Sequence, residues 1–206
     1  PEDTPCFDLN AACTGFLYAL HTAECLLNAA PRKFGLVIGA EQLSRITNWE
    51  DRGTCILFGD GAAAVVVECR EGWPSIGAVL GSRGDDQILR VPGVETGVPS
   101  LIYMEGTKVF KFAIEAVPWC MDQVLEKTGK TIDDVDFFVF HQANARIIDL
   151  VVRRYHIPPE KYYKNIQEYG NTSAASIPLV LSDLFQQGRV GSGSRVLIVG
   201  FGGGLT

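Results

Sequence analysis

The stretch Phe7-Asp8-Leu9-Asn10-Ala11-Ala12-Cys13-Thr14-Gly15-Phe16 decides the fold of this chain. Its apolar bias up to Leu9 predicts a buried strand, and apolar residues at helical spacing over 15–29 predict a helix, so Cys13 falls at the junction. A thiol at a helix N-terminus faces unpaired N–H groups and the positive end of the macrodipole, and both favour the thiolate. The same N–H groups could stabilise an oxyanion after attack on a carbonyl. From this stretch alone, however, a buried structural cysteine is the better interpretation.

Length and composition set the broad class of protein. The chain has 206 residues, 47% hydrophobic and 20% charged, which indicates a soluble globular protein of one large or two small domains, and no apolar run approaches a membrane span. A net charge of −6 argues against broad nucleic-acid binding. Six scattered cysteines without a C-x-x-C pair are interpreted as reduced thiols, with disulfides or a zinc site as alternatives. Because the first residue is Pro1, we expect the N-terminus to have been lost or to belong to another piece.

Strands and helices alternate along the rest of the chain. Apolar runs predict strands at 34–39, 62–69, 135–140 and 195–200, and helical spacing predicts helices over 107–127, from Ala143 onward and over 179–185. We expect a kink or a break at Pro118, a helix cap at Ser173, and strands and loops over 71–100. This alternation predicts an α/β fold with mixed or parallel sheets. Cys13, His141, Asn171 and the run 202–204 each follow a predicted strand, at the edge where such folds build sites.

Three motifs with polar or nucleophilic residues follow one another along the chain: 10–16 (NAACTGF), 141–144 (HQAN) and 169–176 (YGNTSAAS). Together they closely resemble the β-ketoacyl-[acyl-carrier-protein] synthase III family, the thiolase-fold condensing enzymes that start fatty-acid synthesis. The segments 51–54 (DRGT), 58–62 (FGDGA) and 201–204 (FGGG) are also similar to that family. Each residue alone has a structural alternative, such as a core histidine or a turn asparagine. The conjunction makes these alternatives improbable.

The resemblance implies a particular architecture. It is a thiolase-like layered αβαβα fold that is incomplete, because most of its first half and its closing strand are absent. Residues 1–70 would be the C-terminal part of the first half, which carries the nucleophile. Residues 71–206 would be the second half, which carries the histidine, the asparagine and the glycine-rich loop.

The resemblance also implies a reaction. Cys13 would attack a short-chain acyl-CoA, giving an acyl-enzyme and free CoA, and malonyl-acyl-carrier protein would then lose CO₂ and attack the acyl group. His141 and Asn171 would donate hydrogen bonds to the enolate oxygen that forms, which needs neither a metal nor a cofactor besides the CoA thioester substrate. The backbone N–H groups of Cys13 and Gly203 would form the oxyanion hole.

Further positions match family residues around the substrates. They are expected to bind CoA (Arg52, Gly106, Phe110 and Asn144), to line the acyl pocket (Leu43, Phe58 and Phe201) and to dock the acidic carrier protein (Lys111, Arg146 and Arg153). The last two lie seven apart, near one helix face, so they could steer an acidic partner.

The resulting prediction is a bacterial cytoplasmic homodimer with acyltransferase activity. Two alternatives remain open. One is a related thiolase-fold condensing enzyme of secondary metabolism, and the other is an inactive fragment that lacks a complete site.

Overall fold

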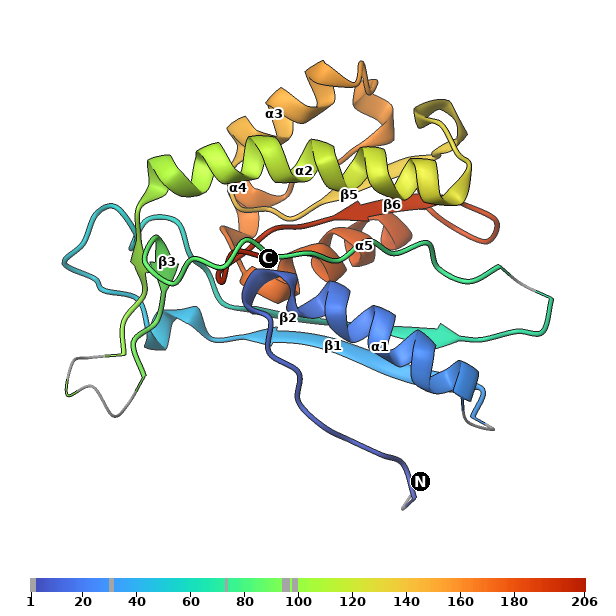
Figure 1. Cartoon of the computed structure of the whole chain (residues 1–206), viewed down its shortest axis with the longest axis horizontal. Helices are drawn as coiled ribbons and strands as arrows, with labels where there is room; N and C mark the ends of the chain where they lie inside the picture. The colour runs from blue at the N-terminus through green and yellow to red at the C-terminus, as the bar shows by residue number, and fades with distance from the viewer. Residues whose placement is uncertain (1–2, 30–31, 73, 94–96, 98–99) are drawn as a thin grey trace.

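The computed structural model describes residues 3–29, 32–72, 74–93, 97 and 100–206. Its helices and strands alternate in four layers, which Figure 1 shows from α2 and α3 at the top to β1 and β2 at the bottom. The strands are β1 (Phe34–Glu41), β2 (Gly61–Glu68), β3 (Leu89–Arg90), β4 (Tyr103–Met104), β5 (Phe137–Phe140) and β6 (Val196–Val199). The helices are α1 (Gly15–Ala29), α2 (Gly106–Thr128), α3 (Ala145–Arg154), α4 (Ile166–Tyr169) and α5 (Ser176–Gln186).

The parallel pair β5–β6 lies at the centre of the core. Its four β5 residues are all buried, and they alternate between two hydrophobic clusters on opposite faces of the pair. Phe138 and Phe140 pack into the cluster that contains the apolar residues of α2 and α3. Phe137 and Val139 pack into the cluster that contains Phe16 of α1 and the apolar residues of α5. This pattern of burial is typical of a strand covered by helices on both faces.

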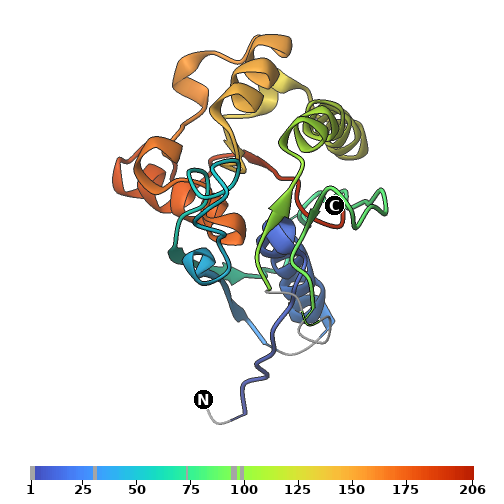
Figure 2. The same ribbon diagram turned by 90° about the vertical axis from the view of Figure 1, so that its left-hand side faces the viewer.

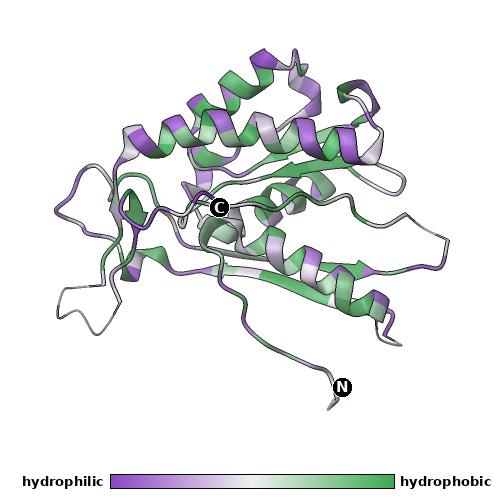
Figure 3. Cartoon of the chain, in the orientation of Figure 1, coloured by the Kyte–Doolittle hydropathy of each residue, from purple (hydrophilic) through white to green (hydrophobic). Residues whose placement is uncertain are grey.

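The antiparallel pair β1–β2 forms the second sheet. It pairs from Phe34 with Glu68 to Glu41 with Gly61. Val37 is buried on the side of α1 and α5, so these helices lie between the two sheets, as Figure 2 shows from a second direction. On the opposite face, Leu36 and Val66 are 61% and 70% exposed. Figure 3 shows both sheets coloured apolar over most of their length, whereas α2 and α3 alternate between polar and apolar residues.

Most of the predicted elements are confirmed. The helix over 15–29 has the predicted bounds, and the strands at 34–39, 62–69, 135–140 and 195–200 correspond to β1, β2, β5 and β6. Over 71–100 the structure describes a single two-residue strand, β3, among loops, and residues 73, 94–96, 98 and 99 of that stretch lie outside the described residues. The mixture of one parallel and two antiparallel pairs agrees with the predicted α/β class.

The predicted strand before Cys13 is wrong. Residues 4–11 have neither strand nor helix structure, and Phe7 is 60% exposed. A strand exists only when a neighbouring strand takes up its N–H and C=O groups, and no described segment pairs with these residues. Cys13 instead lies in a 3-10 turn (Ala12–Thr14) that leads directly into α1.

Two other local predictions have different outcomes. The break at Pro118 does not occur, because α2 continues through it as one helix, and a kink there stays a prediction. Its neighbours Val117 and Met121 are fully packed in the core, and their burial outweighs the roughly 3 kcal/mol that a proline costs inside a helix. Ser173 caps no helix, since α5 begins three residues later without a side-chain cap. Ser173 instead uses its backbone: its N–H donates to Oδ1 of Asn171 at 2.9 Å.

Candidate active site

Cys13 is held at the N-terminus of α1 by close packing against the glycine-rich loop that follows β6. A Cβ atom on Gly202 would lie 2.9 Å from Cβ of Cys13 and 3.0 Å from its backbone nitrogen, so only glycine fits there. Asn10 fixes the turn from the other side, because its Oδ1 accepts the N–H of Ala12 at 3.0 Å. Cys13 is 8% exposed. Two segments nearly 190 residues apart therefore define its position.

The protonation state of Cys13 differs from the expectation of an easily formed thiolate. Burial raises the pKa of the Cys13 thiol to about 11, and the Glu41 carboxylate adds to the rise. The Ser173 hydroxyl and the N–H groups of Cys13 and Gly203 lower this pKa, but by less than burial raises it. The helix N-terminus is present as predicted, yet desolvation outweighs it. At rest, the structure thus holds a neutral thiol.

His141 follows β5 directly and is only 3% exposed. Its Nδ1 lies 2.6 Å from Oγ of Ser176, whereas its Nε2 is buried without a hydrogen-bond partner among the described residues. Burial lowers the pKa of His141 to about 4, so the imidazole is neutral at pH 7. The ring packs edge-to-face against Phe201, with centroids 5.4 Å apart. His141 therefore presents one neutral ring nitrogen that is free to bind a substrate.

Asn171 is positioned by backbone pairing with the segment before β2. Its N–H donates to the carbonyl of Leu57 at 2.8 Å, and its own carbonyl accepts the N–H of Gly59 at 3.0 Å. Any Cβ on Gly59 would collide with the carbonyl of Tyr169, which explains the glycine. Because Oδ1 of Asn171 already accepts the Ser173 N–H, its Nδ2 is the end left to face the cavity.

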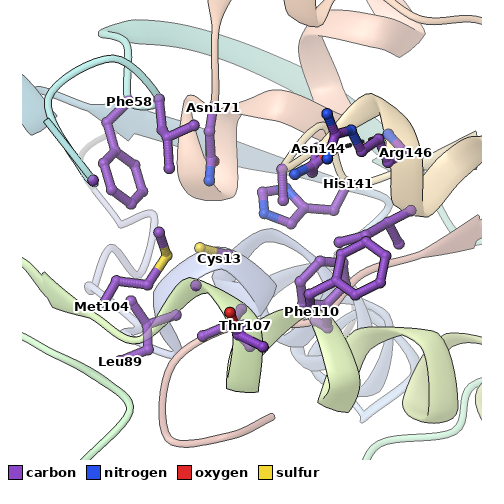
Figure 4. A pocket seen from close by; sticks show the side chains of 18 residues that line it. Cys13, Phe58, Leu89, Met104, Thr107, Phe110, His141, Asn144, Arg146 and Asn171 are labelled. Atoms are coloured by element: carbon purple, nitrogen blue, oxygen red, sulfur yellow. Dashed lines mark hydrogen bonds between the residues drawn. The ribbon is translucent and has the colours of Figure 1, made fainter.

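Cys13, His141 and Asn171 line one cavity of about 370 Å³. Figure 4 shows their side chains converging on the same space from three separate segments. Six other predicted residues also line this cavity: Phe58, Gly106, Phe110, Asn144, Arg146 and Phe201. Nine of the site residues predicted from the sequence therefore line this one cavity.

The remaining predicted residues lie elsewhere. Gly203 does not line the cavity, although its N–H approaches the Cys13 sulfur. Leu43 is buried outside the cavity. Three exposed basic residues also lie off its lining: Arg52, Lys111 and Arg153. The roles proposed for these five residues stay predictions.

Several cavity residues escaped the sequence analysis. The apolar ones are Leu57, Leu89, Val109, Met104, Ala143 and Ile147, and the others are Gly53, Thr107 and Gly202. Gly202 carried a signal, since it lies in the quoted glycine run, but the neighbour that requires a glycine could not be known. Leu89 and Met104 carried none, because β3 and β4 are too short to be recognised by periodicity.

Two family models match the chain. The model described as 3-oxoacyl-[acyl-carrier-protein (ACP)] synthase III matches residues 7–84, and its C-terminal counterpart matches residues 125–206. The β-ketoacyl-[acyl-carrier-protein] synthase III of Clostridium acetobutylicum is 42% identical over 215 residues, which cover 100% of this chain and 66% of that protein. In none of the described helices is there a stretch long and apolar enough to span a bilayer.

Solved structures share the fold. The crystal structure of 3-oxoacyl-[acyl-carrier-protein] synthase III from Aquifex aeolicus superposes with a TM-score of 0.92 at 42% identity, covering 99% of this chain and 65% of that one. The priming β-ketosynthase from the R1128 polyketide pathway gives 0.89 at 36% identity, covering 97% and 62%. The layered thiolase-like fold is confirmed over the part of these structures that the chain spans. The chain, which spans about 65% of the length of the relatives it matches, belongs to the 3-oxoacyl-[acyl-carrier-protein] synthase III family.

Proposed function

We propose that this chain carries the reactive centre of a decarboxylating condensation, in which a short-chain acyl-CoA primer and malonyl-acyl-carrier protein give a 3-oxoacyl-acyl-carrier protein. The proposal rests on the unpaired state of Nε2 of His141. This nitrogen is buried without a partner among the described residues, beside a cavity that Cys13 and Asn171 also line. An unpaired buried polar atom costs free energy that a substrate oxygen would recover. The names of the related synthases support the same reaction.

The first half-reaction is acyl transfer to Cys13. The sulfur forms a bond to the thioester carbonyl, the bond to the CoA sulfur breaks, and the thiol proton leaves with CoA. Because Cys13 is neutral at rest, the proton departs as the sulfur attacks rather than beforehand. The N–H groups of Cys13 and Gly203 both approach the sulfur, which makes them suitable donors to the oxyanion.

The second half-reaction is decarboxylation and carbon–carbon bond formation. Loss of CO₂ leaves an electron pair that is delocalised onto the malonyl thioester oxygen. Nε2 of His141 and Nδ2 of Asn171 are neutral donors that could hold this oxygen without a metal. The carbanion then attacks the acyl carbonyl on Cys13, the carbon–sulfur bond breaks to release the product, and the departing thiolate takes a proton from water to restore the resting thiol.

The cavity residues suggest how the substrates lie. Gly106, Phe110 and Asn144 line the cavity and support a path for the pantetheine arm, while Phe58 and Phe201 support an apolar acyl site. Arg146 is exposed and lines the cavity, which suits contact with an acidic carrier protein.

Intact-mass measurement with peptide mapping tests the first half-reaction. After incubation with acetyl-CoA and, separately, a branched acyl-CoA, we expect one acyl group on Cys13 and none in Cys13→Ser. Cys25→Ser, which alters an exposed thiol of α1, should acylate normally and serves as the control. A folded chain that gains no acyl group, or gains it elsewhere, would contradict the proposal and favour the inactive-fragment alternative.

The division of labour needs its own test. We expect His141→Ala and Asn171→Ala to retain most acyl transfer but to release little CO₂ from malonyl-acyl-carrier protein. Equal loss of both half-reactions in these variants would contradict the assignment of the two side chains to the enolate.

A second candidate is a condensing enzyme of secondary metabolism. It is favoured by the likeness to the priming β-ketosynthase of a polyketide pathway at 36% identity. The acceptor discriminates between the two. Turnover with malonyl-acyl-carrier protein from fatty-acid synthesis supports the first candidate, whereas turnover only with another carrier or a small-molecule acceptor supports the second.

We also propose the organisation that the family suggests: a cytoplasmic homodimer, with the nucleophile in the half that ends near residue 70 and the histidine, asparagine and glycine-rich loop in 71–206. Light scattering of the purified protein tests the dimer. A mass equal to one 22.4 kDa chain would contradict it.

A further inference from the structure

The reactive face of His141 depends on which ring nitrogen carries the proton. A neutral imidazole has one N–H donor and one lone-pair acceptor. If Nε2 carries the proton, it can donate to an enolate oxygen in the cavity. If Nδ1 carries it, Nε2 presents a lone pair, which repels that oxygen. The hydrogen bond made by the other ring nitrogen sets which of the two tautomers is present.

Ser176 is the only side chain that bonds the other ring nitrogen among the described residues. Its Oγ lies 2.6 Å from Nδ1 of His141, and the residue is 1% exposed at the first position of α5. The same oxygen accepts the backbone N–H of Gln142 at 3.3 Å. Ser176 therefore touches His141 and the residue that follows it.

The hydrogen-bond count decides the direction of the short contact. A serine hydroxyl has one proton to donate and two lone pairs. The Gln142 N–H occupies one lone pair of Ser176. If Nδ1 also donated to Oγ, the hydroxyl proton would have no acceptor, because no described carbonyl lies within bonding distance of it. A buried donor left without an acceptor is costly.

With the hydroxyl donating to Nδ1, each group is satisfied. The Gln142 N–H donates to Oγ, and Oγ–H donates to Nδ1. The proton of the neutral ring must then be on Nε2, the nitrogen that has no partner among the described residues, in a side chain that lines the cavity.

We infer that Ser176 is a positioning residue, which holds His141 as the Nε2–H tautomer so that its free donor points into the cavity. This inference deepens the proposed function, since the donor it creates is the one assigned to the enolate. It is separable from that function, because the tautomer can be measured without turnover.

Nitrogen-15 NMR of the whole chain supplies the test. The chain has three histidines, so loss of one imidazole spin system in His141→Gln assigns the signal. We expect a pyrrole-type shift for Nε2 and a pyridine-type shift for Nδ1 in the unmodified protein. The reverse pattern overturns the inference, whether or not the protein is active.

Substitution of the serine gives the second readout. In Ser176→Ala we expect a mixture of tautomers and a fall of about five- to tenfold in kcat for CO₂ release, with acylation of Cys13 unchanged. Ser176→Thr, which keeps the hydroxyl, should restore the Nε2–H form. Ser182→Ala removes a hydroxyl from the same helix, where among the described residues it bonds only the exposed Gln186, and should change neither signal.

Each outcome is decisive. An unaltered tautomer in Ser176→Ala refutes the role of the serine. Absence of both acylation and CO₂ release in the unmodified protein refutes the proposed function and leaves the NMR result standing. If Ser176→Ala does not fold, the nitrogen shifts of the unmodified protein still decide the direction of the hydrogen bond.

Discussion

Burial of His141 makes the stability of this protein depend on pH in a direction that can be worked out. The pKa of His141 is about 4 in the folded chain and 6.5 when the side chain is not buried. The unfolded chain therefore binds the proton more readily than the folded chain. Above about pH 7.5 both states are neutral and the group contributes nothing. As the pH falls below 6.5 the unfolded state gains protons first and folding loses free energy. The loss amounts to about 2 kcal/mol at pH 5 and about 3 kcal/mol at pH 4.

Denaturant titrations of the unmodified chain and of His141→Gln measure this effect. Other groups titrate in both proteins, so the informative quantity is the difference between the two changes in unfolding free energy from pH 7.5 to pH 5. We expect the unmodified chain to lose about 2 kcal/mol more than the variant. Parallel pH profiles would refute the reasoning, because they would mean that His141 keeps an ordinary pKa and is not desolvated.

Three further substitutions test the packing and the charge of the site. Gly202→Ala places a Cβ 2.9 Å from the buried thiol's Cβ, so acylation should fall at least tenfold by mass spectrometry, while Gly191→Ala, which meets no atom within 4 Å, should be silent. Leu184→Ala, at a fully buried core position, should cost about 2–5 kcal/mol in a denaturant titration, against a few tenths for Phe185→Ala, which is 58% exposed. Arg146→Glu should raise the apparent KM for malonyl-acyl-carrier protein more than that for acyl-CoA, and equal changes would contradict docking at this residue.

The local sequence was sufficient to predict those helices and strands whose own residues show a helix or strand pattern. The helix over 15–29 and the four apolar residues of β5 were predictable because their periodicity or β-branched and aromatic content specifies them directly. The segment 7–9 has a similar apolar bias, yet it forms no strand. A strand needs hydrogen bonds from a neighbour, and that neighbour is not encoded in the strand's own residues.

The three reactive residues of the site were predictable, but their electrostatics were not. Motifs identified Cys13, His141 and Asn171 as one group, and the fold brings them to one cavity. The helix N-terminus beside Cys13 predicted a lowered thiol pKa, since that feature can be recognised in a short stretch. Whether the thiol is also desolvated depends on residues that cover it, and Gly202 comes from the far end of the chain. The partner of His141, Ser176, was likewise present in a quoted motif without any sign of its contact.

One physical cause, desolvation, acts on both reactive groups in opposite senses. It raises the pKa of Cys13 to about 11 and lowers that of His141 to about 4, so both are neutral over the whole range between. A thiolate–imidazolium pair is therefore not the resting state, because it would place two charges where burial opposes each of them. In the proposed reaction this has a clear consequence. The histidine acts as a hydrogen-bond donor rather than as an acid, and negative charge appears in the site only when a substrate brings it to donors that are already in place.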